Sequence, residues 1–197
     1  MPSPLFNQLI HSLCCLPGVG KKSAQRMALY LIERDKVSAK RLVRVLAESI
    51  EKIDRCVRCR NLTEDLLCSL CGSERSNKGL LCVVETPADL LAIEQANCFF
   101  GTYFVLHGHL SPIDGIGPEE LGFDELFKQL HEHDLKEVIL ATNLTLEGET
   151  TAQFIADKSR SLGKKVSRIA YGVPMGGELE YVDGGTLSLA LDRRKII

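Results

Sequence analysis

Apolar residues recur at helical spacing through the first 55 residues of the chain. Leu5, Leu9 and Ile10 form a first stripe, and Ser3 followed by Pro4 supplies a helix cap and a proline at the first helical position. This helix is expected to end near Cys15. A second stripe resumes at Ala24, and a third helix should begin at a cap on Ser38. The third helix is expected to turn one apolar face inward, made of Leu42, Val45, Leu46, Ile50 and Ile53, and to carry Lys40, Arg41 and Arg44 on its outer face.

The pattern changes after Asn77-Lys78-Gly79, where short apolar runs alternate with helical segments. The runs predict strands at 80–84, 103–106, 137–141 and 166–170, and the segments between them predict helices at 87–96, 118–132 and 150–162. This alternation indicates an α/β domain with a mainly parallel sheet and helices on both faces. Loops with a function in such sheets follow the carboxyl ends of strands, here 85–87, 107–118 and 142–149.

Four parts are predicted for this multi-part α/β chain. They are a helical part (1–55), a cysteine-rich segment (56–79), the α/β domain (80–171) and a Gly-rich strand and helix segment (172–197). In the last part, Gly172, Gly176 and Gly177 precede a short apolar run at 178–183 that is expected to form a strand.

Charge is divided unevenly among these parts, although the net charge is only −2. Residues 1–55 carry 10 Lys and Arg against 5 Asp and Glu, whereas residues 80–197 carry 10 against 18. A basic first part favours a polyanion as its partner, and an acidic body favours a protein or a cation. The basic residues of the third helix either widen a phosphate contact or only solvate that helix.

Four of the eight cysteines fall in two C-x2-C pairs. Cys56 with Cys59, and Cys68 with Cys71, have the spacing at which four thiolates converge on one Zn²⁺. Four sulfurs fill a tetrahedral shell, so the site is expected to be structural and not catalytic. The alternatives are two disulfides or four free thiols. The first residues show no signal peptide and no membrane span is found, so a cytoplasmic chain with reduced thiols is expected.

A glycine turn joins the first two helices. Leu16-Pro17-Gly18-Val19-Gly20 lets the backbone turn tightly, and the helix that follows presents unpaired N–H groups that can bind a phosphate. Lys21, Lys22 and Arg26 lie on or just after this turn. The arrangement resembles the helix-hairpin-helix motif, which grips the DNA backbone without reading bases. A plain turn between two helices is the alternative.

Acidic residues follow two strands of the α/β domain. Glu85 after the first strand, and the loop from Thr142 to Glu149 after a later one, resemble the Toprim domain of topoisomerases and primases. In its catalytic members an Asp-x-Asp pair in the second loop holds Mg²⁺ together with the first glutamate. Here Asn143 and Thr145 stand at the aspartate positions, so Mg²⁺ binding should be weak and catalysis is not expected. Glu85, Glu147 and Glu149, with Asp114, are expected to form either a weak cation site or a surface for a protein partner.

Two further sets of residues were weighed as sites. The His107/His109 and His131/His133 pairs have metal-ligand spacing but are not expected to bind a second metal. Cys14, Cys15, Cys82 and Cys98 lie in apolar context and are expected in the core.

The order of these parts, with the runs Leu110 to Pro118 and Gly172 to Tyr181, resembles the RecR family of bacterial recombination mediators over essentially the whole chain. The resemblance implies a non-enzymatic DNA-repair protein that forms a ring-like tetramer around DNA. It also implies action with RecO and RecF to load RecA on single-stranded DNA coated by its binding protein. On this resemblance Lys22 and Arg26 contact DNA, and the acidic Toprim face meets RecO. The main alternative is a Toprim nuclease or primer-synthesising enzyme that uses Glu85, Glu147 and Glu149, and a zinc ribbon that binds RNA is a second alternative.

Overall fold

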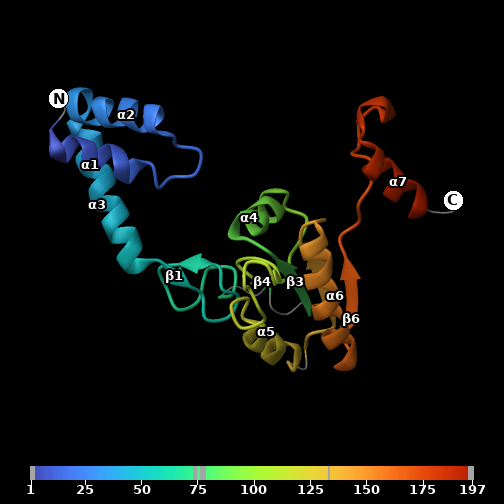
Figure 1. Cartoon of the computed structure of the whole chain (residues 1–197). Coiled ribbons are helices and arrows are strands. Elements are labelled where there is room, and N and C mark those ends of the chain that lie inside the picture. Colours follow the sequence, from blue (N-terminus) through green and yellow to red (C-terminus); the bar gives the residue numbers. More distant parts are fainter. Residues whose placement is uncertain (1–2, 73–74, 76–78, 133, 195–197) are drawn as a thin grey trace. The chain divides into compact units, whose positions relative to one another are not determined.

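The computed structural model describes residues 3–72, 75, 79–132 and 134–194. The chain divides into two compact units, residues 1–53 and 54–197. Each unit is described by itself (Figure 1).

The first unit is helical. It contains α1 (Pro4–Leu13), α2 (Lys21–Leu29), a π-helical turn η1 (Tyr30–Arg34) and α3 (Lys36–Lys52). Ser3 caps α1 as predicted, because its side chain accepts a hydrogen bond from the Phe6 amide. The small buried residues Ala24 and Ala28 let α2 pack closely on Ile10 of α1.

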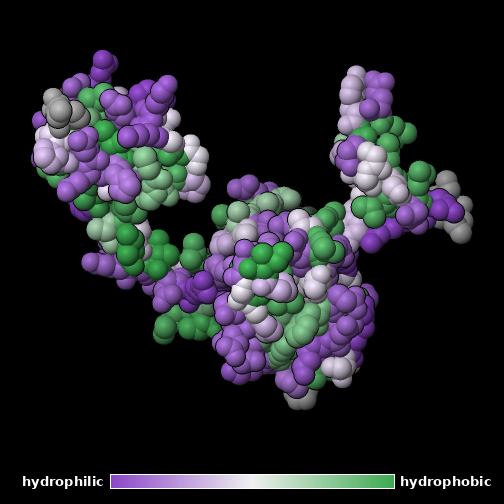
Figure 2. All heavy atoms as spheres, viewed as in Figure 1, coloured by the Kyte–Doolittle hydropathy of each residue, from purple (hydrophilic) through white to green (hydrophobic). Residues whose placement is uncertain are grey.

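Two predictions for the third helix are wrong. The cap is Asp35, not Ser38, because the Asp35 carboxylate accepts the Ser38 amide at 2.9 Å. The face expected inside is open, since Leu42, Val45, Leu46, Ile50 and Ile53 are 40–74 % exposed. The helix is 17 residues long and its second half extends past α1 and α2, which leaves those side chains uncovered within the unit. Figure 2 shows the resulting apolar surface along this helix.

The second unit is built on a four-stranded parallel sheet, as predicted. The strands β3 (Leu80–Val84), β4 (Thr102–Val105), β5 (Glu137–Ala141) and β6 (Lys165–Arg168) lie in the order β4-β3-β5-β6. Three helices follow strands: α4 (Pro87–Gln95), α5 (Phe123–Leu130) and α6 (Leu146–Ser161). Two of these helices begin elsewhere than predicted, since Gly122 in a left-handed conformation starts α5 and Thr145 caps α6.

Both faces of the sheet are covered because successive strand residues point to opposite sides. On one face, Leu81 and Val83 of β3 pack with residues of α5 and α6. On the other, Cys82 and Val84 pack with Leu90 of α4, and Leu70 from the cysteine-rich segment joins them. The sheet therefore holds the loops after β3, β4 and β5 at one edge, where Glu85, Leu106 and Thr142 begin them.

A small antiparallel ladder pairs β1 (Asp54–Arg55), just before the cysteine-rich segment, with β2 (Leu62–Thr63) inside it. The C-terminal part holds a 3-10 turn η3 (Leu179–Tyr181) and α7 (Gly184–Asp192), and no strand is present among its described residues. The strand predicted at 178–183 is thus wrong: Tyr181 bonds back to Glu178, and Asp183 already caps α7. Of the helices in the described part of the chain, none combines the length and the apolar character that a membrane crossing requires.

Candidate metal centre, DNA-binding turn and acidic loop

The four predicted metal ligands come together. Cys56, Cys59, Cys68 and Cys71 are buried, and their sulfur atoms all lie within 4.8 Å of one another. The Sγ atoms of Cys59 and Cys68 are 3.4 Å apart. Tetrahedral Zn²⁺ with Zn–S bonds of about 2.3 Å holds its sulfurs about 3.8 Å apart, so the four thiols fit a structural zinc ion. No disulfide is formed among them.

The thiols also differ in how readily they ionise. Hydrogen bonding from Cys71 lowers the pKa of Cys59 to about 6, whereas burial raises the pKa of Cys68 to about 11. Without a metal, the Cys59 thiolate is stabilised by its neighbours, whereas Cys68 and Cys71 resist a further negative charge in the same space. A dication removes that repulsion, which is the electrostatic reason for a metal here.

Hydrogen bonds to its backbone carbonyls attach the cysteine-rich segment to the sheet. The Val105 amide donates to the Cys59 carbonyl at 2.8 Å, and Nε2 of His107 donates to the Arg60 carbonyl at 2.6 Å. Arg60 and His107 both have a φ of 62°, an unusual left-handed backbone for such residues. Burial lowers the pKa of His107, which keeps its ring neutral as a donor.

The Arg60 side chain is a second attachment, which no sequence pattern predicts. Its guanidinium is buried, donates to the Glu120 carbonyl at 3.0 Å and lies over the ring of Phe104 at 5.8 Å. Gly122 makes room for it, because a Cβ built there would stand 1.3 Å from Nη1 of Arg60. Outside the buried contact, Arg58 pairs with Glu132 at 2.6 Å. The cysteine-rich segment, called the zinc element below, and the parallel sheet thus share one interface.

The glycine turn has the predicted form. Gly18 has a φ of 75°, and Gly20 is the N-cap of α2, where no described side chain occupies the first amides of the helix. Lys21, Lys22 and Arg26 are all exposed, and Lys21 lines a surface pocket of about 530 Å³ between α1 and α2. The turn therefore presents free N–H groups and three cations on one stretch of helix, which suits a phosphate backbone.

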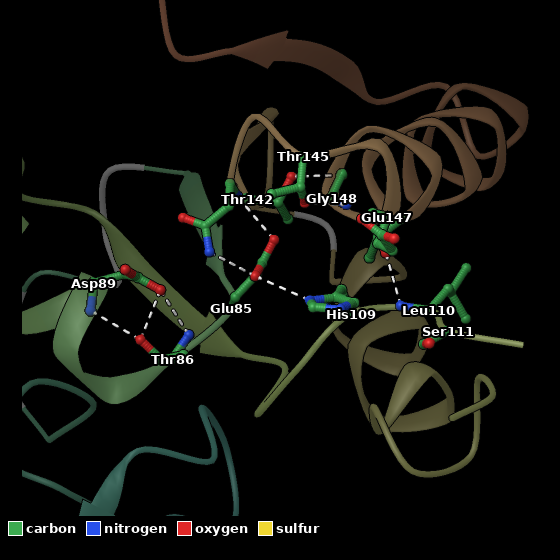
Figure 3. Close-up of polar contacts among 12 residues, drawn as sticks. Glu85, Thr86, Asp89, His109, Leu110, Ser111, Thr142, Thr145, Glu147 and Gly148 are labelled. Atoms are coloured by element: carbon green, nitrogen blue, oxygen red, sulfur yellow. Dashed lines mark hydrogen bonds and ion pairs between the residues drawn. The ribbon is translucent and has the colours of Figure 1, made fainter. Parts of the chain in front are cut away.

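The acidic side chains at and near the 142–149 loop each contact a different partner. Glu85 is buried, and its two carboxylate oxygens accept the backbone and side-chain amides of Asn143, both at 2.8 Å. Nδ1 of His109 lies 3.4 Å from the same carboxylate (Figure 3). Glu149 instead meets Arg168 at 2.8 Å, and Asp114 accepts from Ser111 at 2.6 Å.

The three predicted glutamates are therefore not gathered around one point. Among the described residues, the four cysteines are the only group of three or more acidic, His or Cys side chains close enough to hold one ion. His133 lies outside the described residues, so the His131/His133 pair is not placed. Of the cysteines expected in the core, Cys82 is buried but Cys15 and Cys98 are exposed, which makes that prediction wrong for these two.

Sequence reasoning missed the roles of Arg60, Gly122 and Arg168, and it considered His109 only as a metal ligand and not as a neighbour of Glu85. Only Arg168 carried a signal, because a lone arginine in the strand predicted at 166–170 interrupts an apolar pattern. A charged side chain inside a buried strand needs partners for its charge.

Comparisons with known proteins agree with this organisation. Three family models match: the RecR helix-hairpin-helix at residues 6–50, a Toprim domain at 79–170 and the RecR C-terminal region at 172–195. A Recombination protein RecR from Saccharophagus degradans is 58 % identical over 197 residues, covering all of both chains. One from Methylococcus capsulatus is 53 % identical over 188 residues, 95 % of each chain. The chain belongs to the RecR family of recombination proteins and has the family's role in recombinational repair.

Proposed function

We propose that this protein is a non-enzymatic mediator that closes around DNA as a homo-tetramer and acts with RecO and RecF to load RecA on single-stranded DNA coated by its binding protein. The observation that carries the DNA part is the glycine turn, whose free amides and exposed cations form one phosphate-binding edge. A protein with this role works at the chromosome, so the cytoplasmic location is part of the proposal.

The acidic body supports the partner part of the proposal. Glu147 is half-buried and Glu149 is exposed at the start of α6, on a domain whose charge is negative overall. A basic protein such as a DNA-binding partner is attracted to such a face. The enzyme alternative is less well supported, because Glu85, Glu147 and Glu149 do not form a group that could hold one metal ion among the described residues.

We expect Lys22→Ala combined with Arg26→Ala to weaken DNA binding and to flatten its salt dependence. Each lost phosphate contact should reduce the slope of log affinity against log salt by about 1, so the double variant should lose about 2. Fluorescence anisotropy with labelled single-stranded and double-stranded DNA over a range of salt measures this. Removing Lys158 and Arg160 by alanine is the matched control, because both are exposed cations on α6. An unchanged slope in the first variant contradicts the proposal.

The open face of α3 supports assembly with further copies of the chain. Leu46 is 56 % and Ile50 74 % exposed, and apolar surface in a row along a 17-residue helix favours burial against a second helix. We expect Leu46→Lys to reduce the solution mass measured by light scattering, because it places a charge in that contact. Glu51→Lys, on the same helix, should leave the mass unchanged. A monomeric parent protein, or an unaltered mass in Leu46→Lys, would argue against the tetramer being built through α3.

A further inference from the structure

The buried acid of the Toprim domain has its charge compensated by this chain alone. The side chain of Glu85 is 4 % exposed, and it accepts two hydrogen bonds from Asn143 at 2.8 Å. His109 stands at 3.4 Å on the open side. A buried carboxylate with these donors needs no further cation to be stable.

The first turn of α6 adds to this compensation. Thr145 caps the helix by accepting the Gly148 amide at 3.1 Å, and a Cβ on Gly148 would stand 2.8 Å from Oε1 of Glu85. The carboxylate is thus in contact with the positive end of a 16-residue helix. Figure 3 shows Glu85 pointing into the space between Thr145, Gly148 and His109.

Arg168 brings a positive charge from β6 to the 142–149 loop. From β6 its guanidinium donates to the Thr142 hydroxyl at 2.8 Å and to the Asn143 carbonyl at 3.2 Å, and it pairs with Glu149 at 2.8 Å. Its side chain is only 15 % exposed. The Arg168 guanidinium therefore holds both the start of the 142–149 loop and Glu149 at its end.

A divalent metal does not fit this arrangement. Mg²⁺ is held by carboxylates that converge on one point, whereas here Glu149 is paired with Arg168, an Asn143 N–H donates to each oxygen of Glu85, and no three acidic side chains of the described residues lie close enough to hold one ion. We propose that Asn143 and Arg168 take the place of the divalent cation of catalytic Toprim domains, so that the acidic loop is ordered permanently and without metal. Asn143 and Arg168 are positioning residues on this proposal, which does not depend on the proposed mediator function.

Manganese is the probe for the wild-type protein. The signal of free Mn²⁺ in electron paramagnetic resonance should be the same with the zinc-loaded full chain as with its Glu85→Gln variant. Buffers without chelator are needed, because a chelator would also remove zinc. If the wild-type protein lowers the signal of free Mn²⁺ and the Glu85→Gln variant does not, the proposal is overturned.

Asn143→Asp should restore a requirement for metal. The change removes an amide donor and places a second carboxylate against Glu85, and two close carboxylates repel unless a cation lies between them. We expect this variant to unfold at a lower temperature than wild type without Mg²⁺, and to regain most of the difference with Mg²⁺. The wild-type protein should unfold at the same temperature with and without Mg²⁺. An Asn143→Asp protein as stable as wild type without Mg²⁺ contradicts the proposal.

Arg168→Met tests the second positioning residue by hydrogen exchange. Loss of charged hydrogen bonds should speed exchange of the amides in 142–149 by about tenfold or more. Lys165→Met is the matched control on the same strand, because Lys165 pairs with Glu137 at 2.8 Å but its side chain is 72 % exposed. Equal exchange rates in the loop for both variants would overturn the role given to Arg168.

Discussion

Replacing Cys59 with serine is expected to release the zinc ion and to destabilise the whole second unit. A structural Zn²⁺ contributes folding free energy directly, and removal of a metal site belongs to the few changes that cost about 4 kcal/mol or more. For a chain of this size that corresponds to a fall of about 10 °C in the unfolding temperature. Bound zinc by mass spectrometry and thermal unfolding by circular dichroism measure the two effects.

The effect should reach the sheet, because the Cys59 carbonyl accepts the Val105 amide and Arg60 is buried against Phe104. Faster hydrogen exchange at β4 is therefore part of the expected result. Cys98→Ser, at an exposed cysteine outside the cluster, should retain zinc and stability. A folded Cys59→Ser protein that loses only DNA binding would instead assign the zinc element to the DNA contact.

Gly122→Ala is expected to break the attachment between the zinc element and the sheet. Two costs add: a residue with a Cβ in a left-handed conformation, about 1 kcal/mol, and displacement of the buried Arg60 guanidinium, about 2 kcal/mol. We expect a loss of about 3 kcal/mol in the free energy of unfolding, measured with urea.

Gly163→Ala separates these two costs. Gly163 has a φ of 73°, close to the 68° of Gly122, but nothing lies within 4 Å of a Cβ built there. It should therefore show the backbone cost alone. If the two variants lose equal stability, the Arg60 contact contributes nothing to holding the unit together.

Sequence patterns predicted those parts of the fold that depend on local spacing. The strand at 80–84 was placed at its observed bounds because five apolar residues follow a glycine. The metal site was found because its ligands lie in two short repeats. The parallel sheet is also confirmed, and so is the position of the loops that follow β3, β4 and β5.

The remaining features depend on contacts between distant parts of the chain. Leu46 and Ile50 have helical periodicity, but periodicity does not say whether a partner helix is present in the same chain. Asn143 was recognised as the loss of a carboxylate, while its hydrogen bonds to Glu85 arise only once two strands are side by side. The Arg60 and Gly122 contact spans the zinc element and α5, and no spacing rule links them.

The hydrogen bond from Val105 to Cys59 matters also for a newly made chain that has not yet bound its metal. β4 is one of the two edge strands of the sheet, and the Cys59 carbonyl accepts one of its outward amides. An uncovered edge next to Tyr103 and Phe104 is a template for strand addition from another chain. We therefore expect zinc supply during synthesis to set how much of the protein aggregates, and chaperone demand to rise when zinc is scarce.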